Sequence, residues 1–233
     1  MKKLLLSTLL LCNCTLIASA GDKIKLGIKL TPCLSFSKVT DKKGSDSADF
    51  SQNGSALRMI IGPFADFTLN DNVTFTTGLW YSPRAIFLSS TANGIINKSQ
   101  YNLQYLMVPG YFKFYTNEVA HDMRLYFTLG GTLDFKIAEK KVGDDNVGLK
   151  DPLAVKEGKP LFNFMDASIQ MATGVEFNLK DVTNLFVGIS YNRGLLNILN
   201  PFLKYNHNGD SIKPYEHLSI KNNLLSLDLG VKF

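Results

Sequence analysis

The residues best suited to chemistry stand just before the last predicted strand of the chain. Glu216, His217 and Ser219 lie close together, and Asp210 and Ser211 precede them. In a regular strand His217 and Ser219 point to the same side, which is where a base and a nucleophile must be. Spacing does not establish hydrogen-bond reach, and Ser, His and Glu side chains in loops are usually just solvated. A catalytic group here is therefore the minor alternative.

An acidic stretch has only a loose likeness to a cation-binding loop. Asp144, Asp145 and Asn146 are followed by Gly148 and Asp151, without the spacing or the closing Glu of a Ca²⁺ loop. The sequence also contains no P-loop and no dinucleotide fingerprint. We therefore expect no catalytic residues, no cofactor and no metal.

Charge and cysteine content exclude two further classes of protein. The formal net charge is +5, but acidic and basic residues balance between Glu139 and Lys159, so we expect no nucleic-acid partner. Of the three cysteines, only Cys33 lies beyond residue 20. A single thiol cannot form an intrachain disulfide, so the chain is not a disulfide scaffold.

The first residues have the pattern of an export signal. Two lysines precede a mostly apolar run over residues 4–17, and Ala18-Ser19-Ala20 matches a small-residue cleavage site. We expect residues 1–20 to be a signal peptide, removed on export through the Sec pathway. Residues 21–233 then form one domain.

Apolar and polar residues alternate with a period of two along most of the remaining chain. In the last stretch, positions 225, 227, 229, 231 and 233 are apolar, and the positions between them are small or charged. This period places the two sets on opposite faces of a β-strand. The pattern predicts eight strands, at Lys23–Phe36, Leu57–Leu69, Val73–Ser82, Tyr101–Tyr115, Arg124–Ile137, Met165–Leu179, Leu185–Tyr191 and 223–233.

The predicted connections alternate between short and long. The short ones are 70–72, 116–122 and 180–183, and the long ones are 38–56, 83–100, 138–164 and 192–217. Outer-membrane barrels have short periplasmic turns and long external loops, and closure leaves no strand edge unpaired in lipid. We therefore predict an all-β fold, an eight-stranded antiparallel up-and-down transmembrane β-barrel with both mature termini in the periplasm.

Two features conflict with a regular barrel. Pro32, Pro63 and Pro109 each remove a ladder donor, and a closed barrel has no edge strand to hold them, so we expect bulges or rim positions there. In the fourth strand, Asn102 and Gln104 imply the reverse phase from the apolar residues that follow.

Alternation alone also fits a soluble periplasmic ligand-binding barrel with its apolar face inside. The polar faces are rich in Gly, Ser, Thr and Asn, which suit the narrow lumen of eight strands, so we expect the apolar face to meet lipid. Aromatic residues near strand ends favour the same orientation. The expected periplasmic belt is Phe67, Phe75, Phe127, Phe177 and Phe233, and the expected outer belt is Phe36, Tyr81, Phe135 and Tyr191.

Charged residues on the polar faces are predicted to lie in the lumen, where they need partners. We expect Arg124 near Glu176, and Lys25 near Asp228, because the first and last strands must pair. The predicted lumen charges are Lys25, Arg58, Asp66, Arg124, Asp134, Lys136, Asp166, Glu176 and Asp228.

Several short motifs resemble the PorT-like outer-membrane β-barrel family. They are Gly27-Ile28-Lys29, Thr77-Gly78-Leu79-Trp80-Tyr81-Ser82, Tyr105-Leu106-Met107-Val108-Pro109 and the closing Gly230-Val231-Lys232-Phe233. The resemblance implies a small barrel in the bacterial outer membrane, and a link to secretion machinery that no residue here marks. We expect Leu229, Gly230, Val231 and Phe233 to form a terminal signal for the barrel-assembly machinery.

The sequence favours a structural or surface-binding role with a side-chain-filled lumen. Its expected partners are outer-membrane lipid, the barrel-assembly machinery, and a protein or ligand at the external loops. One alternative is a lipid-modifying hydrolase or acyltransferase with a rim site. A narrow pore and the soluble barrel are two more.

Overall fold

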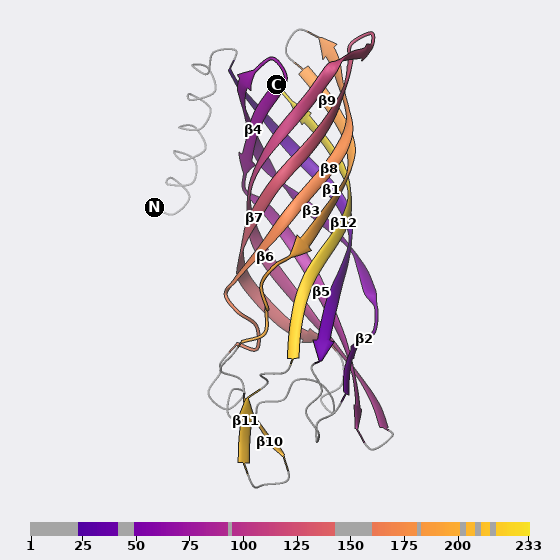
Figure 1. The fold of residues 1–233 in the computed structure, drawn as a ribbon, viewed down its shortest axis with the longest axis vertical. Helices are drawn as coiled ribbons and strands as arrows, with labels where there is room; N and C mark the ends of the chain where they lie inside the picture. Colours follow the sequence, from indigo (N-terminus) through magenta and orange to yellow (C-terminus); the bar gives the residue numbers. More distant parts are fainter. Residues whose placement is uncertain are drawn as a thin grey trace, which may run out of the picture.

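A computed structural model describes residues 23–41, 49–92, 95–142, 160–180, 183–200, 204–207, 211–214 and 218–233. Strands dominate these segments (Figure 1), and no helix long and apolar enough to cross a membrane occurs in them. The strands are β1 (Ile24–Asp41), β2 (Asp49–Gln52), β3 (Ser55–Asn70), β4 (Val73–Gly78), β5 (Trp80–Ala92), β6 (Ile95–Ala120), β7 (Met123–Val142), β8 (Met165–Lys180), β9 (Thr183–Gly194), β10 (Lys204–His207), β11 (Ser211–Pro214) and β12 (Leu218–Lys232).

Ten strands form one antiparallel sheet, and β10 and β11 form a separate hairpin. The sheet runs β1-β12-β9-β8-β7-β6-β4-β3-β5-β2. It closes on itself, because β1 pairs with β12 along one edge and with β3 along the other. Strands β4 and β5 follow one another between the same two neighbours, β3 and β6.

The two ends of the barrel differ in their connections. The β3–β4 and β6–β7 turns lie at the end that also holds the C-terminus, at the top of Figure 1. We call this the turn end and the opposite one the loop end. The predicted connection 116–122 is wrong, because β6 continues to Ala120 and only His121 and Asp122 make the turn. Asp122 has a φ of 57°, a left-handed conformation that Asp tolerates in tight turns.

Alternate residues of each strand face the exterior, and these are mostly apolar. Leu129 and Leu227 are 46% and 44% exposed, whereas their neighbours Thr128, Ser226 and Asp228 are buried. Exposed apolar side chains of this kind occur on β1, β3, β5, β6, β7, β8, β9 and β12, far beyond the patch that a soluble monomer exposes. Burial thus separates an apolar exterior from an interior that holds the polar and charged side chains together with buried apolar ones.

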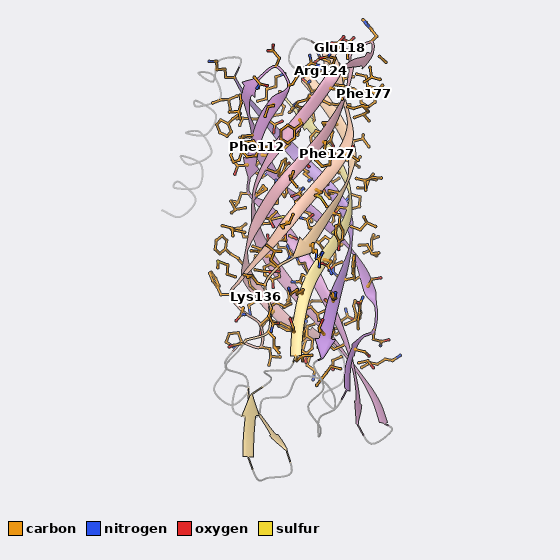
Figure 2. All side chains as sticks on the ribbon, viewed as in Figure 1. Phe112, Glu118, Arg124, Phe127, Lys136 and Phe177 are labelled. Atoms are coloured by element: carbon orange, nitrogen blue, oxygen red, sulfur yellow. The ribbon has the colours of Figure 1, made fainter. Side chains whose placement is uncertain are left out.

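Aromatic rings are part of this exterior near the turn end. Phe112, Phe127 and Phe177 lie there in Figure 2, each more than a third exposed. Phe75 and Phe112 are opposite each other in the β4–β6 ladder, with ring centroids 5.4 Å apart. The belt predicted for this end contains Phe75, Phe127 and Phe177, but not Phe112.

The predicted long connection 83–100 is wrong. Strands β5 and β6 pair continuously from Trp80 opposite Met107 to Ala92 opposite Ile95. The phase of β6 does not reverse, since Tyr105 and Met107 are buried inside like Leu103. Towards the loop end, the apolar side chains point inward and the polar ones outward. This inversion explains why period-two analysis based on an apolar exterior missed the extension.

The predicted third strand is interrupted at Leu79, opposite Gly62 and Pro63. The Leu79 amide donates to the Pro63 carbonyl oxygen, at 3.1 Å, across this break. A Cβ at Gly62 would collide with the Leu79 carbonyl and Trp80, so only glycine permits the approach. Pro32 also lies at a break, because proline cannot donate a ladder hydrogen bond. Pairing between β1 and β12 stops at Leu30 and resumes at Cys33.

The wall between β3 and β5 is also irregular towards the loop end. Between Ile61, opposite Tyr81, and Gln52, opposite Leu88, no β3 residue pairs with β5 in the described ladder. Ser35 of β1 replaces part of this pairing: its hydroxyl accepts a hydrogen bond from the Ala85 amide at 3.1 Å. Ala85 is fully buried as a result of this local overlap.

Candidate functional site

The interior of the barrel carries the densest set of ionisable side chains, and alternation along the strands places them there. Nine charged residues are less than a tenth exposed. They are Lys29, Asp66, Arg84, Lys113, Asp134, Asp166, Glu176, Asp228 and Lys232. Such burial requires partners, and the partners divide these residues into three groups.

The first group lies nearest the turn end and joins four strands. Asp66 of β3 accepts hydrogen bonds from Lys113 of β6 and Lys232 of β12, each at 3.1 Å. Lys232 also lies 2.8 Å from Glu176 of β8, whose second oxygen accepts a hydrogen bond from the Tyr115 hydroxyl at 2.8 Å. Two lysines and two carboxylates balance, so this group carries no net charge.

The second group is a single ion pair. Lys29 lies 3.0 Å from Asp228, on the neighbouring strand β12. The Thr31 hydroxyl donates to the same carboxylate at 3.2 Å. The lysine ammonium also lies 4.3 Å from the centroid of a Trp80 ring, a cation–π distance. This pair is balanced as well.

The third group joins β5, β7 and β8 across the lumen. Arg84 donates to Asp134 at 2.7 Å and to Asp166 at 3.2 Å. The two aspartates are directly opposite each other in the β7–β8 ladder. Asn222 of β12 donates to Asp166 at 3.3 Å, and the Tyr105 ring lies 4.7 Å from the guanidinium carbon. We call Arg84, Asp134 and Asp166 the Arg84 triad.

An aromatic cluster fills the lumen between these charged groups. Glycines on neighbouring strands make room for the rings. The Tyr126 hydroxyl lies over Gly174 and Gly188, and the Phe186 ring lies over Gly230. The cluster consists of Cys33, Ile60, Phe64, Trp80, Met107, Tyr111, Tyr126, Phe186 and Leu224.

A second apolar cluster fills the lumen towards the loop end. Phe162 and Leu199 form an isolated bridge between two connecting segments that the cluster buries. Side chains of β5, β6 and β12 surround them. The cluster consists of Ile86, Leu88, Tyr101, Leu103, Tyr105, Phe162, Ile198, Leu199, Leu218 and Ile220.

An open cavity of about 370 Å³ lies at the turn end, above the first charged group. Glu118 and Arg124 stand at its rim, as Figure 2 shows. Its floor is made by the buried Asp66, Glu176 and Lys232. The cavity therefore ends at the ion pairs of the first charged group.

The nine predicted lumen charges occupy different environments. Asp66, Asp134, Asp166, Glu176 and Asp228 are buried inside, and Lys136 contacts Glu139 and the Phe162 carbonyl oxygen at the inner wall. Lys25 is half-buried at the turn-end mouth.

Arg58 lies apart from the ion-pair groups. Its guanidinium donates to the Leu57 carbonyl oxygen and to Asn102, at 3.2 Å and 2.9 Å. Asn102 points away from the lumen, because its neighbours on β6 point inward.

Neither expected ion pair forms as predicted. Asp228 pairs with Lys29, and Lys25 instead lies 3.4 Å from the Asn184 side-chain oxygen. Arg124 is opposite Glu176 in the ladder, but Glu176 uses both oxygens on Lys232, Tyr115 and Asn184. The side-chain pairing depends on reach across the lumen, which the ladder register alone does not determine.

Sequence reasoning missed four of the buried cations. Lys29, Lys113 and Lys232 stand on the polar faces of predicted strands, so the alternation itself contains the signal. Arg84 falls in a predicted loop because β5 and β6 are predicted too short.

The candidate catalytic and cation-loop residues cannot be compared with this network. Asp210, Glu216, His217 and the acidic stretch 144–151 lie outside the described residues. The backbone of Ser219 lies on β12, opposite Thr40 of β1. Within the described segments, no group of three His, Cys, Asp or Glu side chains is placed to hold a metal ion.

A closed sheet with an apolar exterior and a plugged polar interior defines a membrane β-barrel. Residues 19–200 match the family model "Outer membrane protein beta-barrel domain". The match covers well over half of the chain, which therefore belongs to this family of outer-membrane barrel proteins. It does not confirm the narrower PorT-like assignment.

Comparison with solved structures finds outer-membrane barrel proteins at very low identity, with TM-scores below 0.5. Neisserial surface protein A is 11% identical, with a TM-score of 0.49, over 90% of this chain and 95% of its own. OprG from Pseudomonas aeruginosa is 11% identical, with a TM-score of 0.49, over 91% and 98%. AlkL, solved in lipid bilayers, is 10% identical, with a TM-score of 0.47, over 92% and 93%. No curated protein sequence matches the chain.

Proposed function

We propose that this protein is a non-enzymatic outer-membrane barrel whose lumen does not conduct. It serves a structural or surface-binding role through its loop end. The observation that supports this most directly is the crossing of the lumen by the Arg84 triad, whose three side chains are at most 1% exposed. A barrel of this width has room for side chains but not for both side chains and a water channel.

The same proposal includes the architecture and topology. Counting β4 and β5 as one interrupted strand, and β2 as an extension of β3, makes the ring eight-stranded. The turn end then faces the periplasm, as short turns do in barrels of this class. Export would use the Sec pathway, with cleavage after Ala20, followed by insertion through the barrel-assembly machinery. A protein or ligand partner would bind at the loop end.

Planar lipid bilayers test the proposal. The purified full-length mature protein, checked for folding by its heat-dependent gel mobility, is expected to give no steady conductance. An open porin measured in the same bilayers is the positive control. Steady ohmic channels from the folded protein would contradict a filled lumen and would favour a narrow pore.

Two further measurements test for a rim enzyme and for a soluble periplasmic barrel. Lipid A from cells with and without the gene is expected to have the same mass spectrum, whereas a changed acyl pattern would support the enzyme. Cell fractionation is expected to recover the mature chain with the outer membrane. Recovery as a detergent-free soluble monomer would support the periplasmic barrel instead.

A further inference from the structure

Among the buried charged groups of the described residues, only the Arg84 triad is unbalanced. It contains one guanidinium and two carboxylates, and the exposed fraction of each side chain is 0–1%. The group nearest the turn end has two cations and two anions, and Lys29 pairs alone with Asp228. If both aspartates were ionised, the triad would carry one uncompensated negative charge inside the barrel. Two carboxyl groups that are this close and this deeply buried do not both ionise without a second cation.

The charged groups that face the triad from neighbouring strands already have partners. Lys136 on β7 contacts Glu139, and Lys29 on β1 contacts Asp228. Arg58 on β3 directs its guanidinium to Leu57 and Asn102, and neither triad carboxylate is among its partners. The described residues therefore supply no second cation to the triad.

Unpartnered atoms show where a cation would bind. Asp134 uses one oxygen for Arg84, and its other oxygen, Oδ1, is buried without a hydrogen-bond partner. Asn222 donates its amide to Asp166, and its own carbonyl oxygen is also buried and unpartnered. The Tyr105 hydroxyl, beside the guanidinium, interacts with the Asn222 side chain but forms no hydrogen bond of regular geometry. Ordered water would satisfy these oxygens, but water would not supply the missing charge.

We propose that the Arg84 triad is a binding site for one monovalent positive charge. The ligand is either a proton held by the aspartate pair or an alkali cation held by Asp134 Oδ1 and Asn222 Oδ1. The site lies in the interior of the proposed barrel, but it does not depend on whether the lumen conducts. The bound proton or cation neutralises the triad and so stabilises the contacts that join β5, β7 and β8.

The test uses the folded full-length mature protein in detergent at neutral pH, first in sodium-free buffer and then with sodium chloride. Infrared spectroscopy counts protonated carboxylic acids, and equilibrium dialysis with radioactive sodium counts bound ions. A bound proton predicts a protonated-carboxyl band that persists in sodium. A bound alkali cation predicts one sodium ion per chain and loss of that band when sodium is added.

Two variants and a control assign the signal. Asp134→Asn and Asp166→Asn each leave a balanced Arg–Asp pair, so each is expected to abolish the bound proton or ion. Glu176→Gln also removes a buried carboxylate, but from the balanced group nearest the turn end, and it should leave the signal unchanged. If one triad variant does not fold, the other carries the assignment. The proposal is overturned if the wild-type protein shows neither signal, or if both triad variants retain it.

Discussion

At the scale of single residues, Lys232 joins the two carboxylates of the group nearest the turn end. It contacts Asp66 of β3, Glu176 of β8 and Tyr115 of β6. The three charged side chains are less than a tenth exposed, so water compensates little for a lost partner. Its removal leaves Lys113 as the sole cation for two carboxylates.

The Lys232→Met variant tests this role in stability. Methionine keeps most of the side-chain volume but removes the charge, so we expect the free energy of unfolding to fall by about 3–5 kcal/mol. Equilibrium urea unfolding of the barrel in lipid vesicles measures the change. Lys25→Met is the matched control, since Lys25 sits half-buried at the mouth and, among the described residues, forms no ion pair and donates a hydrogen bond to Asn184. A similar loss in both variants would contradict a special role for Lys232.

At the level of single residues, the sequence predicted on which face of a strand a charged side chain lies. It did not predict which residue that side chain pairs with. Alternation placed Asp66, Asp134 and Glu176 on polar faces, and these side chains are buried in the lumen. The partner of each depends on how far each strand is displaced along the barrel relative to strands that it does not touch. That displacement accumulates over several ladders, including the breaks at Pro32 and Leu79. No local sequence pattern records it.

At the scale of strands, glycines fix how closely β8 and β9 approach the aromatic cluster. A Cβ at Gly188 would lie closest to the Tyr126 hydroxyl oxygen. A Cβ at Gly174 would instead lie closest to the backbone oxygen of Val187. At both positions the Cβ would come too close to the Tyr126 hydroxyl and to a backbone oxygen, but the hydroxyl is the nearest atom at 188 and the backbone oxygen is the nearest at 174.

Alanine substitutions separate these two conflicts. We expect Gly188→Ala and Gly174→Ala each to lower the free energy of unfolding by about 1–3 kcal/mol, because both overfill the interior. Adding Tyr126→Phe removes the hydroxyl, so it should recover a larger share of the loss at position 188 than at 174. Double-mutant cycles from urea unfolding measure the coupling. Equal recovery at both positions would refute this assignment of the contacts.

Strand existence was easier to predict than strand length. Each predicted strand overlaps a described strand or spans β4 and β5, because apolar-out alternation is strong in the middle of the barrel. Lys23 and Phe233 lie just outside β1 and β12, and β2, β10 and β11 were not predicted. Beyond the middle of the barrel, β5 and β6 carry their apolar residues inward, on Leu88 and Leu103 for example. A change of solvent outside the barrel, from lipid to water, reverses the pattern without ending the strand.

At the scale of the whole molecule, the apolar exterior favours contact with lipid over contact with water. Leu227 lies on this surface in the middle third of β12, whereas Leu57 lies near the loop end of β3 and is 74% exposed. The cost of a charge on the exterior depends on its depth in the membrane. The proposed orientation therefore predicts different costs at these two leucines.

Arginine at each position tests the depth. Leu227→Arg is expected to lower the free energy of unfolding in lipid vesicles by about 2–4 kcal/mol, and Leu57→Arg by about 0–1 kcal/mol. Urea titrations in the same lipid compare the two variants with the wild-type protein. Equal, small costs would show that the exterior does not meet the hydrocarbon core.

The position of Lys232 has a consequence for biogenesis. Asp66 and Glu176 belong to early and late hairpins, and the cation that both contact arrives only with β12. In a nascent chain that stops before β12, Lys113 is the one lysine of this group left for Asp66 and Glu176. Strand β1 also lacks β12, one of its two neighbours. Truncated translation products therefore expose an unpaired strand edge and uncompensated carboxylates to envelope proteases. The finished barrel exposes neither.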